Sequence, residues 1–265
     1  MRTISKSGAS SKGERARIFL VCGRPCPVIG QVTDIKTGAP IEGARVNLFG
    51  GLGSPFAVTD ADGRFELKGC PKVDRYRLYV APPQREPYLA GSATVPGRPG
   101  LEPVEVVLHL YPAVPVNGRV IDETTGQPVA AEVSYYPIYP NSHVVDGINA
   151  SAINAVGPFS SASSRPDGSF TLHVLAGPGA LAVRTLTKAE FEPVLVDVEA
   201  FFEKEGVRHD PEERNGTDKD SLLINYAPSA RASTPQSQFQ GITLLNVPED
   251  AKELTRDVTV KSKAK

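Results

Sequence analysis

Residues 30–46 read GQVTDIKTGAPIEGARV, and residues 118–133 read GRVIDETTGQPVAAEV. In register, the two stretches share a glycine, a valine, an aspartate, a threonine, a second glycine and a proline. These identities occupy offsets 0, 2, 4, 7, 8 and 10 from Gly30 and Gly118. Six identities within eleven positions are hard to obtain by chance. We therefore interpret the two stretches as the same starting point of one folding unit that the chain uses twice.

A second landmark recurs downstream of each start. Residues 59–67 read TDADGRFEL and residues 164–172 read SRPDGSFTL, so both contain Asp-Gly-x-Phe-x-Leu. The distance from the first glycine to the landmark aspartate is 32 residues in the first copy (62 − 30) and 49 in the second (167 − 118). The second copy therefore carries about 17 additional residues before its landmark.

Each copy consists of short alternating apolar segments separated by turn residues, which is typical of β-strands. The Thr-Gly and Asp-Gly pairs suit turns, because glycine adopts a positive φ without steric cost. Residues 44–48 of the first copy then predict a strand that returns beside the first one in a hairpin-like pair. Together these patterns predict an all-β chain of two tandem Ig-like or prealbumin-like Greek-key β-sandwiches.

The repeat divides the chain into three parts. Residues 1–27 are expected to form a basic tail and a lead-in strand at about residues 18–22, without a signal peptide, because the apolar run there is only five residues long. The first sandwich is expected at 28–111 and the second at 116–261, joined by a short proline-bearing linker, 111–115.

The second copy departs from the first beyond residue 188. Apolar residues at helical spacing between Asp197 and Glu205, followed by Gly206, predict a short helix with a C-terminal glycine cap. Residues 207–238 are polar and rich in proline, serine and asparagine, which predicts a long loop. Strands are expected again at 241–245 and 256–260.

The composition suits a soluble globular protein and argues against capture of nucleic acid by charge. The 265 residues have a net charge of −1 and are 40% hydrophobic, and no apolar run approaches the length of a membrane span. The three cysteines are Cys22, Cys26 and Cys70. Their spacing is compatible with a Cys22–Cys26 disulfide but does not require one, and we expect partly buried thiols.

The motif G-x-V-x-D-x-x-T-G-x-P, followed by the Asp-Gly-x-Phe turn, resembles the carboxypeptidase regulatory-like domain family. That resemblance implies a transthyretin-like β-sandwich, here in tandem copies as in multi-module proteins of planctomycete-type bacteria. It also implies a non-catalytic module of a larger cell-envelope or exported protein.

The residues that carry hydrolytic or oxidative chemistry do not converge in the sequence. None of the four histidines (His109, His143, His173 and His209) has a glutamate three residues later, and there is no His-x-His pair of the kind that iron dioxygenases of this fold use. Asp60 and Asp62 begin like a calcium loop, but no bidentate glutamate follows at the required spacing. No serine nucleophile motif is present. We therefore expect no catalytic residue, no metal and no cofactor.

These observations favour a structural or interaction module that contacts other protein modules through its edge strands and the long loop at 207–238. The alternative is a carbohydrate- or peptide-binding module, in which Tyr135, Tyr136 and Tyr139 provide stacking faces for a cell-surface ligand.

Overall fold

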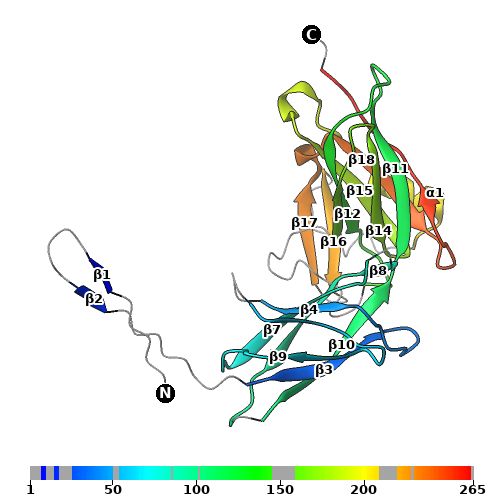
Figure 1. Ribbon diagram of the computed structural model, residues 1–265. Coiled ribbons are helices and arrows are strands. Elements are labelled where there is room, and N and C mark those ends of the chain that lie inside the picture. The colour runs from blue at the N-terminus through cyan, green and yellow to red at the C-terminus, as the bar shows by residue number, and fades with distance from the viewer. Residues whose placement is uncertain are drawn as a thin grey trace.

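A computed structural model describes residues 7–9, 15–17, 26–49, 54–84, 86–100, 102–144, 159–208, 220–227 and 230–263. Within these residues the chain is built almost entirely of strands, which form two sandwiches arranged one after the other (Figure 1). The expected all-β class is therefore confirmed. Cys22, His209 and the lead-in strand expected at 18–22 lie outside the described residues.

The first sandwich consists of two four-stranded sheets. One sheet has the order β6 (Arg64–Leu67), β3 (Val28–Asp34), β10 (Val104–Pro112) and β8 (Tyr88–Leu89). The other has the order β5 (Phe56–Val58), β4 (Arg45–Leu48), β7 (Arg75–Ala81) and β9 (Gly91–Pro96). The inward residues of both sheets form one core, in which Val32, Val46, Leu67 and Leu78 are fully buried.

The second sandwich repeats this arrangement. β11 (Val114–Asp122) lies between β14 (Ser169–Val174) and the final strands β19 (Leu254–Thr255) and β20 (Val258–Val260). The facing sheet has the order β13 (Ser160–Ser163), β12 (Ala131–Pro137), β15 (Gly177–Thr185) and β18 (Gly241–Val247). In each sandwich the first strand pairs antiparallel with one neighbour and parallel with the last strand.

Gly30 and Gly118 lie in the same surroundings. A Cβ atom built on Gly30 meets the carbonyl oxygen of Val106 and the ring of Phe65, and one built on Gly118 meets the carbonyl oxygen of Arg256 and the ring of Phe170. Both glycines thus lie where the first strand, the last strand and the landmark phenylalanine come together. No larger residue fits there without displacing the backbone of the last strand.

The turn after each first strand is also the same. Asp34 Oδ1 accepts hydrogen bonds from the backbone N–H groups of Lys36 (2.7 Å) and Thr37 (2.9 Å). Asp122 accepts from the Thr124 N–H at 3.1 Å and from the Thr125 hydroxyl at 2.9 Å. These are the Asx-type turns that the Asp-x-x-Thr-Gly motif favours, and the glycines that follow, Gly38 and Gly126, have positive φ.

The junction between the sandwiches differs from the expected linker. Only Ala113 separates β10 from β11, so one nearly continuous extended segment runs through both sandwiches (Figure 1). The backbone N–H of Ala113 donates to the Pro87 carbonyl at 2.7 Å. Leu89 and Tyr111, from the first part of the chain, pack into the core of the second sandwich. We propose two domains at 28–111 and 116–261, and the side chain of Tyr111 at the end of the first packs in the core of the second.

The second sandwich has a long excursion, which is the segment between β15 and β18, and it is partly as predicted. Helix α1 (Val198–Glu205) has Asp197 as its N-cap, whose carboxylate accepts from the Ala200 N–H, and Gly206 as a left-handed C-cap with φ 67°. The short helix is therefore confirmed. The prediction of a long loop at 207–238 is wrong for its second half. There β16 (Ser221–Ala227) and β17 (Ala230–Pro235) form an antiparallel hairpin, which a 3₁₀ turn at Gln236–Gln238 follows.

Three further details correct the sequence interpretation. The strand at residues 45–48 does not pair with β3, since it belongs to the opposite sheet beside β5 and β7. The Asp62-Gly63 turn likewise joins strands of two different sheets. At the N-terminus, Ser7–Ala9 (β1) pairs antiparallel with Arg15–Arg17 (β2), where we expected a tail without strands.

The crowding at Gly30 and Gly118 predicts a large loss of stability on substitution. Gly30→Ala and Gly118→Ala should each lower the free energy of unfolding by about 3 kcal/mol, because the new methyl group overlaps a backbone carbonyl that cannot move without breaking the parallel pairing. Urea unfolding followed by circular dichroism measures this change.

Gly38→Ala is the matched control, since Gly38 has a positive φ but no heavy atom within 4 Å of an added Cβ. It should cost only about 1 kcal/mol from backbone strain. A loss at Gly30 or Gly118 no larger than the loss at Gly38 would contradict the close approach of the last strand.

Candidate functional site

The tyrosines proposed as stacking faces do not form an open platform. Tyr135 is 0% exposed and Tyr136 is 1% exposed. The Tyr135 hydroxyl donates to the Leu175 carbonyl at 3.4 Å, and the Tyr136 ring contacts Phe239 with centroids 5.8 Å apart. Tyr139 is half-buried and follows the end of β12. Because the rings of Tyr135 and Tyr136 are buried in the core, neither of them can stack on a ligand.

The described histidines lie apart and have separate partners. His109 Nδ1 lies 2.9 Å from the Thr33 hydroxyl, His143 Nε2 lies 3.4 Å from a Glu249 carboxylate oxygen, and burial lowers the pKa of His173. Among the described residues, no group of three or more His, Cys, Asp or Glu side chains is placed to hold a metal ion. Within the same part of the chain, no helix is long and apolar enough to cross a membrane.

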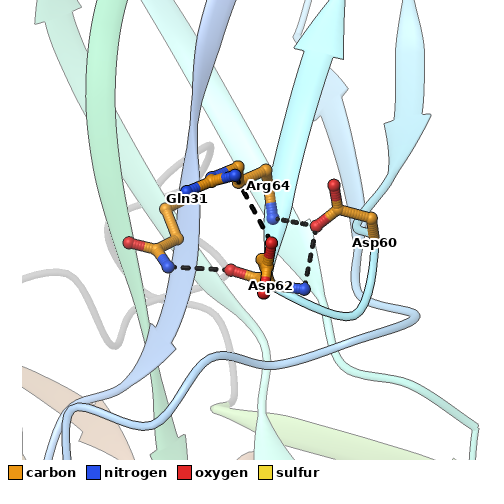
Figure 2. Close-up of polar contacts among 4 residues, drawn as sticks. All are labelled: Gln31, Asp60, Asp62 and Arg64. Carbon is orange, nitrogen blue, oxygen red and sulfur yellow. Dashed lines mark hydrogen bonds and ion pairs between the residues drawn. The ribbon is translucent and has the colours of Figure 1, made fainter.

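The carboxylates of the Asp-Gly turn are used in holding the turn itself (Figure 2). Asp60 Oδ1 accepts from the backbone N–H groups of Asp62 (3.0 Å) and Arg64 (2.8 Å). The Asp62 carboxylate pairs with the Arg64 guanidinium at 3.3 Å, and its backbone carbonyl accepts from Gln31 Nε2 at 2.7 Å. These contacts account for both aspartates as turn residues.

The outer face of the sheet β5-β4-β7-β9 combines arginines with exposed aromatic rings. We call Arg45, Phe49, Phe56, Arg75 and Arg77 the arginine–aromatic face. The guanidinium of Arg45 lies 4.1 Å from the ring centroid of Phe56, and that of Arg77 lies 5.5 Å from that of Phe49. Phe49 and Phe56 are 46% and 56% exposed. Stacked arginines of this kind keep their N–H groups free to bind carboxylates.

A hollow of about 700 Å³ opens at one end of this face. Its described lining residues include Arg75 and Arg77, together with apolar side chains, and none of them is acidic. Within the described part of the chain, no ion pair involves Arg45, Arg75 or Arg77. Two guanidinium groups on alternate residues of one strand, neither with an ion-pair partner among the described residues, therefore border a concave, partly apolar surface.

The corresponding face of the second sandwich is covered. Val46 lies between Ala57 and Val80, and Val133 lies between Ala162 and Val183, so β4 and β12 occupy equivalent places. Counting from these valines, Phe49 corresponds to Tyr136, and β7 corresponds to β15. The outward residues near the middle of the second sheet are buried, namely Ser134, Tyr136, Ala180 and Ala182, whereas Glu132 of β12 and Ser161 and Ser163 of the edge strand β13 are exposed.

The cover comes from the excursion between β15 and β18. Phe239 packs on Tyr136, and the Arg184 guanidinium lies 4.9 Å from the Phe239 ring centroid. Gln236 ties the end of the excursion to its beginning, because its side chain bonds both the N–H (2.7 Å) and the carbonyl (3.2 Å) of Val196. Among the described residues, the first sandwich has no segment that corresponds to this cover.

A second concavity of about 330 Å³ lies at the junction of the two sandwiches. Tyr111, Val114 and Leu175 provide apolar lining, and His143 and Glu249 lie at its rim. Because the His143 and Glu249 side chains pair with each other, they offer less unsatisfied charge to a ligand than the arginines do.

Sequence reasoning did not select the arginine–aromatic face. Tyr76, Leu78 and Val80 of β7 are buried in the core. Alternation along the same strand places Arg75 and Arg77 on the opposite side. The signal was therefore present in the sequence, but the exposure of Phe49 and Phe56 and the absence of a cover required the fold.

Fold and site together define a β-sandwich protein with an exposed face of arginines and aromatic rings. Residues 27–109 match the family model of the carboxypeptidase regulatory-like domain. This part of the chain is therefore similar to domains of that family. A comparison with curated proteins finds no match.

Several solved structures show a distant likeness. The Bacillus anthracis TIE protein is 10% identical with a TM-score of 0.30; the alignment covers 97% of this chain and 41% of that one, so the chain spans less than half of its length. The shaft pilin SpaA of Lactobacillus rhamnosus GG is 9% identical with a TM-score of 0.26, covering 91% of this chain and 98% of that one. A DUF3823 family protein from Parabacteroides merdae is 15% identical with a TM-score of 0.26, over 61% and 90% of the two chains. At these values the likeness carries no inference about function.

The buried Asp34 carboxylate is held in its ionised form by hydrogen bonds. Burial alone raises the pKa of Asp34, but the N–H groups of Thr37 and Lys36 and the Tyr88 hydroxyl outweigh it, so the pKa lies below its ordinary value. Tyr88 donates to Asp34 Oδ2 at 2.9 Å, and burial together with this bond raises the pKa of Tyr88 to about 12. Asp34 thus supports the turn by its charge, which is a structural role.

Asp34→Asn should therefore destabilise the protein in a pH-dependent way. A carboxyl whose pKa is lower in the folded state stabilises above its unfolded pKa of about 3.9, and this contribution is lost as the pH falls further. We expect a loss of about 1–2 kcal/mol at pH 7, because hydrogen bonds to a charged group are removed, and a smaller difference from the wild type below about pH 3. Urea unfolding at several pH values measures it.

Tyr88→Phe is the companion variant, since it removes one donor to Asp34 but leaves the charge. It should show a smaller loss that follows the same pH trend. Stability curves for Asp34→Asn and the wild type that stay parallel from pH 3 to pH 7 would show that the charge of Asp34 plays no part.

Proposed function

We propose that the protein is a non-catalytic interaction module and that its contact surface is the arginine–aromatic face of the first sandwich. The observation that carries this proposal is the difference between two equivalent sheets. One buries the middle of its outer face under its own excursion, while the other leaves phenylalanine rings exposed beside arginines that have no described acidic partner. The match of residues 27–109 to the carboxypeptidase regulatory-like domain supports a role without catalysis.

The composition of the face supports a protein partner. Arginine and aromatic residues are enriched at protein–protein interfaces, where they form the anchors that carry most of the binding energy. Phe49, Phe56 and Val58 offer apolar area, and the hollow beside Arg75 and Arg77 offers a concave place for an inserted side chain. The edge strands β5 and β9 flank this face, so an extended segment could also pair along either edge.

The charge of the face defines the chemistry of the partner. Three arginines without a described acidic partner favour a segment that carries carboxylates, and the exposed rings favour apolar or aromatic side chains beside them. We therefore infer an acidic polypeptide segment with interspersed apolar residues. The family resemblance supports, as part of this proposal, such a contact within a larger cell-envelope or exported assembly.

Binding of a fluorescein-labelled random copolymer of glutamate and tyrosine tests the proposal by fluorescence anisotropy. The full chain should bind it, more weakly as salt rises, and should not bind a lysine–tyrosine copolymer. Reversing two charges in Arg75→Glu/Arg77→Glu should weaken binding at least about tenfold, which corresponds to about 1.4 kcal/mol.

The matched control is Arg98→Glu/Arg119→Glu. It makes the same change in net charge at exposed arginines that do not belong to the face. Equal weakening by both double variants would show that net charge alone drives binding and would contradict a site at the face. Binding to heparin but not to the copolymer would replace the acidic polypeptide with a sulfated polysaccharide.

A further inference from the structure

Two buried cysteines meet at one end of the first core. Cys26 precedes β3 and is 1% exposed, and Cys70 follows β6 and is 0% exposed. The backbone N–H of Cys26 donates to the carbonyl of Cys70 at 3.1 Å. This bond lies just beyond the antiparallel pairing of β3 with β6, in which Val28 faces Leu67, and it is shifted by one residue from that register. The two residues are thus direct neighbours in space although 44 positions (70 − 26) separate them in the sequence.

The backbone geometry suits a covalent bond between them. Residues on neighbouring antiparallel segments that are shifted by one position have Cα atoms about 6 Å apart, from a strand spacing of about 4.8 Å and a rise of about 3.4 Å per residue. That separation lies inside the range of roughly 4.4–6.8 Å that a disulfide spans. In the reduced state shown here, the Cys26 thiol donates to the Glu102 carbonyl at 2.9 Å and the Cys70 thiol donates to the Leu67 carbonyl at 3.4 Å. A rotation of the two side chains, without a change of strand pairing, exchanges these weak bonds for a crosslink.

We propose that Cys26 and Cys70 form a structural disulfide that closes the first sandwich. One cysteine thiolate attacks a disulfide oxidant, such as oxidised glutathione or an oxidoreductase, and releases one thiolate of that oxidant. The second cysteine thiolate then attacks the mixed disulfide at the protein sulfur and releases the other half. Two protein thiols lose two electrons and two protons, and the disulfide oxidant is reduced to two thiols.

Burial determines when this reaction takes place. Burial is the main cause that raises the pKa of the Cys70 thiol, with a smaller contribution from Cys26, so the folded protein holds little of the reactive thiolate. An oxidant also has no access to side chains that are covered to this degree. The crosslink therefore forms while the first sandwich folds, and the reduced thiols are inert once folding is complete.

The crosslink has a consequence for the hollow beside the arginine–aromatic face. Gly69, Pro71 and Val73, on either side of Cys70, are among its lining residues. Joining Cys70 to the start of β3 ties the turn before β7 to the core and restrains the wall next to Arg75. The disulfide does not depend on the proposed partner, since it rests only on the positions of the two cysteines.

Peptide mapping of the full chain tests the proposal. The protein is refolded from urea in a mixture of reduced and oxidised glutathione, denatured, treated with iodoacetamide and digested without reduction. Mass spectrometry should find a peptide containing Cys26 joined to one containing Cys70, with Cys22 alkylated. Cys22→Ser should keep this crosslink and Cys70→Ser should lose it.

Stability gives a second readout that needs no variant. The crosslinked wild type and the same sample reduced with dithiothreitol are compared in urea, and hydrogen exchange of peptides from β3 and β6 follows the first sandwich. The crosslinked form should have a roughly thousandfold smaller unfolding constant, as expected for a disulfide that closes a loop of this length. Three alkylated cysteines, a crosslink that uses Cys22, or a crosslinked form no more stable than the reduced one would overturn the proposal.

Discussion

Both sandwiches depend on a first strand that is paired on its two sides. β3 lies between β6 and β10, and β11 lies between β14 and the final strands. The pairing with the last strand is parallel, so the chain must pass through the whole sandwich before this contact forms. The close approach leaves room only for glycine at residues 30 and 118. Each sandwich therefore closes late, and its core is sealed when the last strand docks beside the first.

This constraint explains why the second sandwich tolerates a long excursion. The segment between β15 and β18 adds a helix and a hairpin, yet β15 and β18 still pair over seven residues, from Gly177–Val247 to Val183–Gly241. Closing a longer loop costs little extra entropy, since the cost rises only with the logarithm of its length. The excursion then recovers stability by burying Phe202 and Phe239 against the sheet. The same addition removes from the second sandwich the exposed face that the first retains.

The sequence predicted the features that are local or repeated. The Asp-x-x-Thr-Gly turn carries its own hydrogen bonds, and α1 has both of its caps within the predicted stretch, so neighbouring residues were enough to find them. Strand partners were not predictable in this way. Residues 45–48 follow β3 closely in the sequence, which favours a hairpin with β3. In a sandwich, however, a strand can join either of two sheets, and residues 45–48 join the sheet opposite β3.

The tyrosines and the hairpin at 221–235 show a second kind of feature that could not be predicted from the sequence. Tyr135 and Tyr136 alternate along β12 and face opposite sides of the sheet, which ordinarily leaves one of them exposed. It is Phe239, about a hundred residues later, that covers Tyr136. A segment distant in the sequence, which was predicted to be a polar loop, thus determines that Tyr136 is a core residue and is not open to a ligand. By the same reasoning, Phe49 and the arginines became candidates only once their side of the sheet was found uncovered.

The junction gives the arginine–aromatic face a defined setting relative to the second sandwich. A flexible linker would let the two sandwiches turn independently, but here strand β10 leads into β11 through Ala113, whose N–H is bonded to Pro87. Leu89 and Tyr111 extend into the second core and so oppose bending at this point with apolar burial on both sides of the chain. Under the proposed function, a partner bound at the face of the first sandwich would be held close to the second. An interaction module would gain from such a short junction, because binding would not carry the entropic cost of ordering a long linker.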